Sequence, residues 1–479
     1  MTVAVLWCFM INSSSDRLVA KLREWIALAP AGTQLPSTRQ LVAEHELSPV
    51  TVQKALRTLI AQGLVESRPG IGTFVRSIPV TRPNDYGWQT AALGAIRNPL
   101  PQVHPSQRSF PNDVIALHSG YPDRELLPQR LVKSAFARVA RSDSVLHRTE
   151  AAGLPELQAW FASELNEHLL PGLAAPTSRD VVILPGSQSG LSSIFRSLVG
   201  RGEPMLIESP TYWGAIMAAA QVGVTLIPVP SGPHGPDTEE LERAFERTGA
   251  RAFYAHPNFA NPTGAQWSAP VAERVLEIVK EHGAFLVEDD WAKDFGISTD
   301  SSPLAARDDT GHVVYLRSLT KSVSPAVRVA GLIARGPARD RILADNQAQS
   351  MYVSGPLQAV ALDVVSQPGW RSHLRSLRQQ LAHRRDQLIL ALSQHVTDAQ
   401  LQSVPAGGLN LWVQLPDETN LHQLERDCET RKLAISAGAS WFPAEEAGKF
   451  LRLNYSGPNP GAFDEGARIL GEELRSQWS

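Results

Sequence analysis

The sequence predicts a multidomain protein in which a small, mostly helical N-terminal domain precedes a large α/β domain. The chain has 479 residues, which is too many for one hydrophobic core. Residues 13–78 show three amphipathic helical patterns and a hairpin pattern, whereas from about residue 180 short apolar runs alternate with helical patterns. A proline-rich stretch at 79–112 separates the two regions and is typical of a semi-rigid spacer.

Composition narrows the class of protein. Apolar residues make up 43% and charged residues 19% of the chain, as in folded globular proteins. Cys8 and Cys428 cannot form a disulfide framework, which fits a cytoplasmic location. Residues 1–12 are apolar but lack a basic start and are too short to cross a bilayer, so we expect a tail with no membrane role. No metal site is predicted.

The net charge is distributed unevenly. Residues 13–78 carry a net charge of +3, although the whole chain has −3. Residues 13–78, here called the head, are thus basic, whereas the rest of the chain is acidic. This difference favours contact of the head with nucleic acid.

The first two helices of the head are indicated by their apolar faces and caps. One face of the first helix is predicted to contain Leu18, Leu22, Trp25, Ile26 and Ala29. Ser37 followed by Gln40 three residues later is a capping-box pattern, which predicts that a second helix begins there.

A third helix is predicted to begin at Pro49, since Ser48 is a favoured N-cap and proline is favoured at the first helical position. Two extended runs follow and are joined by a glycine-containing turn at 68–72. Together these elements make a winged helix-turn-helix, whose recognition helix enters the major groove while the wing contacts phosphate or the minor groove. On pattern alone, the alternative is a small helical interaction domain.

A resemblance favours the first interpretation. The stretch G-T-Q-L-P-S-T-R-Q-L, followed by L-S-P-V-T-V-Q-K-A-L and G-L-V-E-S-R-P-G-I-G-T-F-V, resembles the GntR-type winged-helix domain. The resemblance implies contact of the head with double-stranded DNA. The expected DNA-binding residues are Arg39 and Thr51, the exposed recognition-helix residues Gln53, Lys54 and Arg57, and Arg68, Gly70 and Gly72 in the wing. Pro49 and Gln53 stand where many relatives carry arginine, so the operator sequence is not implied.

The body, residues 113–479 with a small domain at roughly 366–479, shows the alternation of strands and helices that is typical of a mainly parallel, doubly covered sheet. The predicted strands are 181–184, 205–207, 224–229, 252–255, 284–288 and 313–316. Ligands of such sheets bind beyond the carboxyl ends of the strands, so the residues after each run are the candidates for a site.

Lys321 lies on a short polar connection between two strongly apolar runs, V-V-Y-L and V-A-G-L-I-A. Taken alone, a lysine in this setting is usually solvated. The alternative is an amine brought towards neutrality so that it can form a Schiff base. Ser318 and Arg328 favour that alternative because a hydroxyl and a guanidinium are phosphate-binding groups. A Schiff-base lysine beside a phosphate site indicates pyridoxal phosphate.

Four further segments follow predicted strands. Ser187 and Gln188 open a helix, where backbone N–H groups can bind an anion. Tyr212 could stack on a planar ring, Asn261 lies in an N-P-T-G turn, and Asp289 is an acid at the end of a strand. Each segment alone also fits an ordinary turn or a core residue, but their joint occurrence points to a cofactor site.

The motif S-L-T-K-S-V-S-P-A-V-R resembles the signature of fold-type I, aminotransferase-like enzymes that use pyridoxal phosphate. The resemblance implies that Lys321 forms the aldimine, Asp289 pairs with the ring nitrogen, Asn261 bonds the ring hydroxyl and Tyr212 lies against the ring. The phosphate would be held by Ser187, Gln188, Ser318 and Arg328.

Three other positions are implied by the same resemblance. Arg452, within K-F-L-R-L-N-Y, stands where an arginine binds a substrate carboxylate. Trp291 stands where relatives usually place a tyrosine. Arg148 stands where a tyrosine often reaches the neighbouring subunit's phosphate in dimers.

A GntR-type head fused to an aminotransferase-like body resembles the MocR subfamily of bacterial transcription regulators. This resemblance implies a cytoplasmic homodimer that binds promoter DNA and senses an amino compound, or pyridoxal phosphate itself, through an aldimine at Lys321. The alternative is an active aminotransferase that carries a DNA-binding head. The complete head favours the regulator, and half-transamination stays open. The effector, the operator and the direction of regulation do not follow from the sequence.

Overall fold

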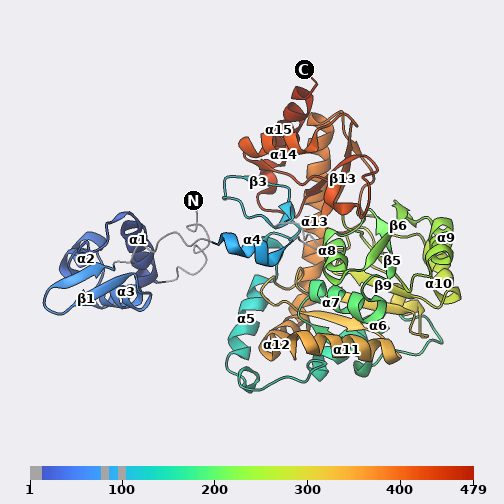
Figure 1. Cartoon of the computed structure of the whole chain (residues 1–479), viewed down its shortest axis with the longest axis horizontal. Helices are drawn as coiled ribbons and strands as arrows, with labels where there is room; N and C mark the ends of the chain where they lie inside the picture. Colours follow the sequence, from blue (N-terminus) through green and yellow to red (C-terminus); the bar gives the residue numbers. More distant parts are fainter. Residues whose placement is uncertain (1–12, 77–85, 95–103, 479) are drawn as a thin grey trace. The chain divides into compact units, whose positions relative to one another are not determined.

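The computed structural model describes residues 13–76, 86–94 and 104–478 (Figure 1). The chain divides into two compact units, residues 1–96 and 97–479. The predicted tail at 1–12 lies outside the described residues, as do residues 79–85 and 95–103 of the predicted spacer.

The first unit contains a three-helix domain with a hairpin, which confirms the winged helix-turn-helix. Its elements are α1 (Ser14–Leu28), α2 (Thr38–His45), α3 (Pro49–Ala61), β1 (Val65–Arg68) and β2 (Gly72–Val75). Apolar side chains of the three helices and both strands form one core, which includes Leu18, Leu41 and Leu59. β1 and β2 pair antiparallel.

The helix starts arise from contacts between close neighbours in the sequence. Ser37 Oγ accepts from Gln40 N at 3.3 Å and Gln40 Oε1 accepts from Ser37 N at 2.8 Å, which is the predicted capping box. Ser48 Oγ accepts from Thr51 N at 3.2 Å and so caps α3.

The second unit is built on an eight-stranded sheet with the order β4-β11-β10-β9-β8-β5-β6-β7. The strands are β4 (Val181–Leu184), β5 (Pro204–Ser209), β6 (Thr225–Gly232), β7 (Gly235–Pro236), β8 (Ala252–Ala255), β9 (Phe285–Asp290), β10 (Val313–Ser318) and β11 (Ala330–Ile333). Strands β10, β9, β8, β5 and β6 run parallel. β11 runs antiparallel to β10, so the turn that carries Lys321 joins two adjacent strands directly.

Helices supply apolar side chains to both faces of this sheet. One core receives them from α5 (Gln129–Val139), α6 (Pro155–Asn166), α9 (Thr238–Thr248), α10 (Ala269–Glu281) and α12 (Gly355–Val365). The other core receives them from α7 (Ser187–Ile194), α8 (Trp213–Val222) and α11 (Gly336–Ser350). Within the described ranges, no helix is both long and apolar enough to cross a bilayer.

The long helix α13 (Pro368–His395) leads into a smaller C-terminal lobe (Figure 1). The lobe contains β12 (Gln400–Leu401), β13 (Asn410–Leu415), β15 (Lys449–Asn454), α14 (Leu421–Thr430) and α15 (Phe463–Ser476). It also includes β3 (Ile115–Ala116), which pairs with β14 (Leu433–Ala434) and lies outside the predicted range 366–479.

Candidate cofactor site and DNA-binding surface

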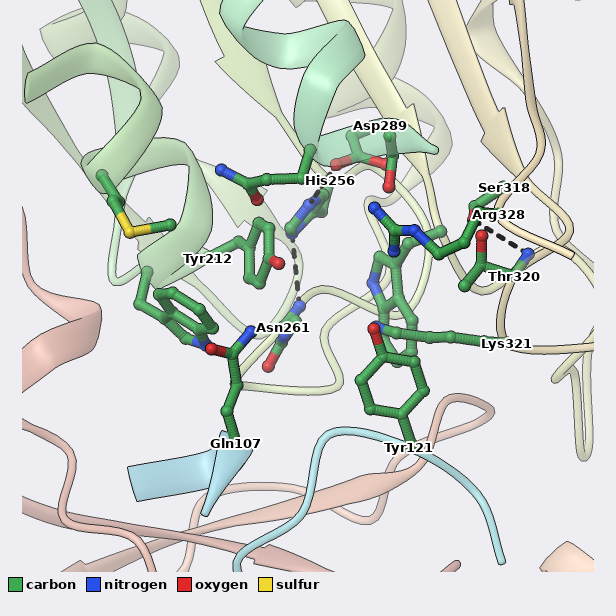
Figure 2. Close-up of a pocket in the computed structure, with 15 residues that line it drawn as sticks. Gln107, Tyr121, Tyr212, His256, Asn261, Asp289, Ser318, Thr320, Lys321 and Arg328 are labelled. Carbon is green, nitrogen blue, oxygen red and sulfur yellow. Dashed lines mark hydrogen bonds and ion pairs between the residues drawn. The ribbon is translucent and has the colours of Figure 1, made fainter. Parts of the chain in front are cut away.

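The segments that follow β4, β5, β8, β9 and β10 line one cavity in the second unit (Figure 2). They meet there because the carboxyl ends of these strands lie at the same edge of the sheet. Every residue predicted to contact a cofactor lines this cavity: Ser187, Gln188, Tyr212, Asn261, Asp289, Ser318, Lys321 and Arg328.

Lys321 points into the cavity from the turn after β10 (Figure 2). Its side chain is half-buried because it faces the cavity, and its Nζ lies 4.1 Å from the centre of the Trp291 ring. Burial lowers the pKa of this amine to about 7, although the Asp289 carboxylate opposes the shift. A large fraction of the amine is therefore neutral and nucleophilic near neutral pH.

Asp289 is held by two side chains of β8 and the turn after it. Tyr254 Oη donates to Asp289 Oδ2 at 3.0 Å and lies 2.9 Å from His256 Nε2. Asp289 is only 2% exposed, and its Oδ1 is buried with no hydrogen-bond partner in the described part of the chain. A buried, unpartnered carboxylate oxygen at the cavity calls for a donor, as a protonated ring nitrogen would supply.

Glu208 fixes the segment that carries His256. Its Oε2 accepts from His256 N at 2.7 Å, while its Oε1 accepts from Ser231 Oγ at 2.9 Å and Trp267 Nε1 at 3.0 Å. Burial raises the pKa of this carboxyl. The roles of Glu208, Tyr254 and His256 were not predicted. Tyr254 lies in β8 and His256 directly after it, and their spacing of two residues, which directs both side chains to the same side, is the signal that could have indicated the pair.

One end of the cavity suits a phosphate. Arg328 lies beside Gly186, and a Cβ on that glycine would lie 2.9 Å from Arg328 Nη2. Gly186 also has φ of +93°, so the turn requires glycine on both grounds. Ser318 Oγ accepts from Thr320 N at 3.2 Å, and Thr320 Oγ1 is buried without a partner among the described residues.

Gln188 makes a different contact from the one predicted. Its Nε2 donates to Gly214 O at 2.7 Å, which directs the carboxamide towards the start of α8. The backbone at the N-terminus of α7, where Gln188 lies, also faces the cavity, and a phosphate contact of Gln188 stays a prediction.

The groups beside the expected ring position are Tyr212, Asn261 and Trp291 (Figure 2 labels the first two). Burial raises the pKa of Tyr212, so its phenol stays protonated. The Asn261 Oδ1 atom is buried without a partner among the described residues, which leaves its carboxamide available to a ring hydroxyl. Trp291 Nε1 donates to Phe259 O at 3.1 Å and thus cannot replace the usual tyrosine hydroxyl.

Arg452 lies beside the cavity but does not line it. Its Nη2 donates to His118 O at 2.6 Å and Ser119 O at 2.9 Å, and its guanidinium lies 4.9 Å from the Trp441 ring centre. Its Nε is buried without a partner among the described residues, and burial lowers the pKa of the side chain to about 9. Nη1 lies 3.6 Å from where a Cβ on Gly120 would be, so the missing side chain leaves room next to it.

Several cavity residues were not predicted. These are Gln107, Tyr121, Trp213, Met217, His256 and Thr320. Gln107 comes from the end of the predicted spacer and Tyr121 from the start of the body, and only the folded chain brings them to the cavity. Arg148 is exposed and lies outside this lining.

The predicted DNA-binding residues lie on the surface of the first unit. Gln53, Lys54 and Arg57 are exposed on α3, opposite the buried Val52 and Leu59. Arg39 is exposed near the start of α2, whereas Thr51 is half-buried beside its cap residue. Contact of these side chains with DNA stays a prediction, with which the exposure of Gln53, Lys54, Arg57 and Arg39 is consistent.

The wing is a tight hairpin between β1 and β2. Gly70 has φ of +72°, and Gln34 Nε2 donates to Ile71 O at 3.0 Å, which ties the tip to the domain. Arg68 Nη2 lies 2.6 Å from Glu66 Oε1, and Arg68 Cζ lies 4.7 Å from the centre of the Phe74 ring. The charge of Arg68 is therefore partly neutralised within the wing. Gly72 has φ of +148° and packs directly against Gln34.

Comparison with known protein families agrees with this division of the chain. Residues 112–470, more than half of the chain, match the family described as aminotransferase class I and II. The chain belongs to the aminotransferase class I and II family. Residues 14–75 of this aminotransferase-family chain match the bacterial regulatory proteins of the gntR family, so its head is a GntR-type domain.

Relatives of two kinds resemble this aminotransferase-family protein. The uncharacterized HTH-type transcriptional regulator YdfD of Bacillus subtilis is 26% identical over 95% of this chain and 94% of its own length. The probable rhizopine catabolism regulatory protein MocR of Rhizobium meliloti is 27% identical over 95% and 92%. The crystal structure of LysN, an alpha-aminoadipate aminotransferase from Thermus thermophilus, matches with a TM-score of 0.71 and 27% identity over 78% of this chain and 96% of its own.

The cofactor indicated by the family and by the LysN structure, which holds a phosphopyridoxyl compound, is pyridoxal phosphate. The cavity fits this group. Hydroxyls and a guanidinium are available for the phosphate at Ser318, Thr320 and Arg328, and the unpartnered Asp289 Oδ1 suits a ring N–H. Lys321 supplies an amine of lowered pKa.

We expect the reaction of Lys321 with pyridoxal phosphate in cofactor-free protein to depend on pH around neutrality. The rate should rise as pH increases through about 7 and then level off, because the ammonium form below that pKa is not nucleophilic. Asp289→Asn removes the carboxylate that raises this pKa, so its midpoint should lie lower still. Absorbance of the bound cofactor measures the rate. A rate that rises only towards the ordinary lysine pKa of 10.5 would contradict the expectation.

Proposed function

We propose that this protein is a pyridoxal-phosphate-dependent, DNA-binding transcription regulator of MocR type. The observation that carries the proposal is that a complete winged helix-turn-helix and a complete cofactor cavity occur in one chain. The regulators YdfD and MocR match this chain from head to body, whereas LysN matches the body alone.

In this function the cavity residues hold the cofactor in a defined orientation. Ser318, Thr320 and Arg328 bind the phosphate, and Lys321 Nζ provides the covalent attachment. Asp289, supported by Tyr254 and His256, keeps the ring nitrogen protonated. When bound, the cofactor supplies a ring that can act as an electron sink.

An amino compound is the proposed effector. Arg452 would bind its carboxylate, since the buried Nε–H of the guanidinium has no partner among the described residues, and the effector's amine would be placed at Lys321. If the effector and DNA each bind two arrangements of the protein with different affinity, the effector changes the affinity for DNA, and DNA changes the affinity for the effector by the same factor.

The protein is further proposed to act in the cytoplasm as a homodimer, which would present two heads to promoter DNA. In the dimer Arg148, which is exposed in the single chain, would reach the phosphate of the neighbouring subunit.

A working aminotransferase is the second candidate, since the family and the LysN similarity favour it and the cavity contains an amine, a ring-nitrogen partner and phosphate ligands. Multiple-turnover assays with an amino donor and a keto acid separate the two functions. The same protein is tested for binding to DNA selected from a random double-stranded pool. A regulator should change its DNA affinity when amines are added and should stop at one product per site. Sustained product with no effect of amines on DNA affinity would reject the regulator.

A further inference from the structure

The part of the cavity wall that is not assigned to the cofactor is made of four uncharged residues. They are Gln107, Tyr121, Trp213 and Met217 (Figure 2 labels the first two). Two of them are aromatic, one is a thioether and one is a carboxamide. This wall is where the remainder of a ligand would lie once its amine is placed at Lys321.

Among the described residues, the lining contains two positively charged side chains, Lys321 and Arg328. Both are placed for the cofactor, and Arg452, just outside, can take one carboxylate. A second carboxylate on the ligand would therefore face the uncharged wall, of which Gln107 is exposed, without a cationic partner among the described residues. A carboxamide on the ligand, in contrast, offers both a donor and an acceptor to an uncharged polar group of the wall, such as the Gln107 carboxamide.

Gln107 is held in place by the residue three positions before it. The His104 ring stacks on Trp213 at 4.3 Å between ring centres and meets Trp441 edge-on at 4.8 Å. Its Nε2 lies 2.7 Å from Ser440 Oγ, its Nδ1 lies 2.7 Å from Ser106 Oγ, and its backbone oxygen accepts from Gln107 N at 2.8 Å.

This anchor connects three parts of the body. Trp213 opens α8 on the large sheet, whereas Ser440 and Trp441 belong to the C-terminal lobe. His104 is 5% exposed, and burial lowers its pKa to about 3, so it stays neutral and its contacts are insensitive to pH near neutrality.

We propose that the Gln107 carboxamide recognises the far end of the ligand, and that the ligand is an amino acid with one carboxylate and an uncharged side chain. His104 is the positioning residue that holds the turn Pro105–Gln107 against the cavity. This inference rests on the proposed function, because it assumes that an amino compound occupies the cavity.

The test compares L-glutamine with L-glutamate, which have the same shape and differ in charge. Dissociation constants are measured on the cofactor-loaded full chain, by the absorbance of the cofactor and independently by the rise of the unfolding midpoint with ligand. We expect glutamine to bind about tenfold more tightly or better, and Gln107→Arg to reverse the preference. Gln380→Arg adds the same charge at an exposed position on α13 and should leave the preference unchanged.

Any of three results would overturn the proposal, and the first two concern the preference between the amino acids. One is equal or tighter binding of glutamate by the natural protein, and the other is a preference that Gln107→Arg does not change. The absence of any midpoint shift with either amino acid would also reject this ligand class. A midpoint shift without any absorbance change would instead refute attachment at Lys321, which belongs to the proposed function, while the ratio of the two constants still tests the inference.

The role of His104 is tested by the same ratio. His104→Ala should lower the preference for glutamine over glutamate to the level that is measured for Gln107→Ala. His104→Phe should restore part of this preference, because the phenyl ring still stacks on Trp213. A merely structural role would lower the unfolding midpoint of the ligand-free protein and leave the ratio unchanged, which would refute positioning by His104.

Discussion

Replacing Lys321 with alanine is expected to abolish the covalent attachment of pyridoxal phosphate. After borohydride treatment and denaturation, the natural protein should keep the cofactor chromophore and the variant should lose it completely. The physical reason is that Lys321 is the only lysine that lines the cavity among the described residues, and that its burial lowers the amine pKa to about 7. Absorbance of the denatured, gel-filtered protein measures the result.

Lys293→Met is the matched control for this experiment. Lys293 is also half-buried with a lowered pKa, but its Nζ contacts His168 Nε2 at 2.8 Å and Ser301 O at 3.1 Å, away from the cofactor cavity. The control should keep its chromophore. If Lys321→Ala retained it through denaturation, the linkage would lie elsewhere and the proposed site would be wrong.

Replacing Gln53, Lys54 and Arg57 together with alanine is expected to lower DNA affinity by about a hundredfold or more, since each base or phosphate contact contributes roughly 1–3 kcal/mol. The head should stay folded because all three side chains are exposed while the buried face of α3 is unchanged. Fluorescence anisotropy with labelled DNA at one fixed salt concentration measures the affinity. Circular dichroism checks the helix content.

Arg17→Ala with Lys21→Ala is the comparison for that variant, because it removes two charges from the exposed face of α1. It should reduce affinity much less. Equal losses in the two variants would mean that the head binds DNA through charge alone, and α3 would then not be the recognition helix.

The head was predictable from its sequence because its signals are local. The contacts that begin α2 and α3 join residues three positions apart, namely Ser37 with Gln40 and Ser48 with Thr51. Such contacts depend on the order of residues along one helix and hardly on the rest of the chain. The apolar periodicity also indicated most of the buried face of each helix, although Trp25, which follows the periodicity of α1, is 38% exposed.

In the body, the sequence determined the strands and the residues that follow them. Buried runs such as 181–184 and 252–255 were placed correctly, and parallel strands carry their following residues to one edge. Ser187, Asp289 and Lys321 therefore meet in one cavity as predicted. The antiparallel direction of β11 was not predictable, because an apolar run of four residues looks the same in either direction.

Only the tertiary structure decided the contacts between distant segments. His104 and Ser440 are separated by 336 positions, and Arg452 donates to the backbone of His118 across 334. No spacing rule relates such residues, since their approach depends on how the lobes pack. The sequence by itself thus determined the two domains, the edge of the sheet at which the parallel strands end, and the residues suited to pyridoxal phosphate. Tertiary packing alone decided which groups support Asp289, where Arg452 lies and what faces the ligand, because these depend on side chains that meet only after the sheet and the C-terminal lobe have formed.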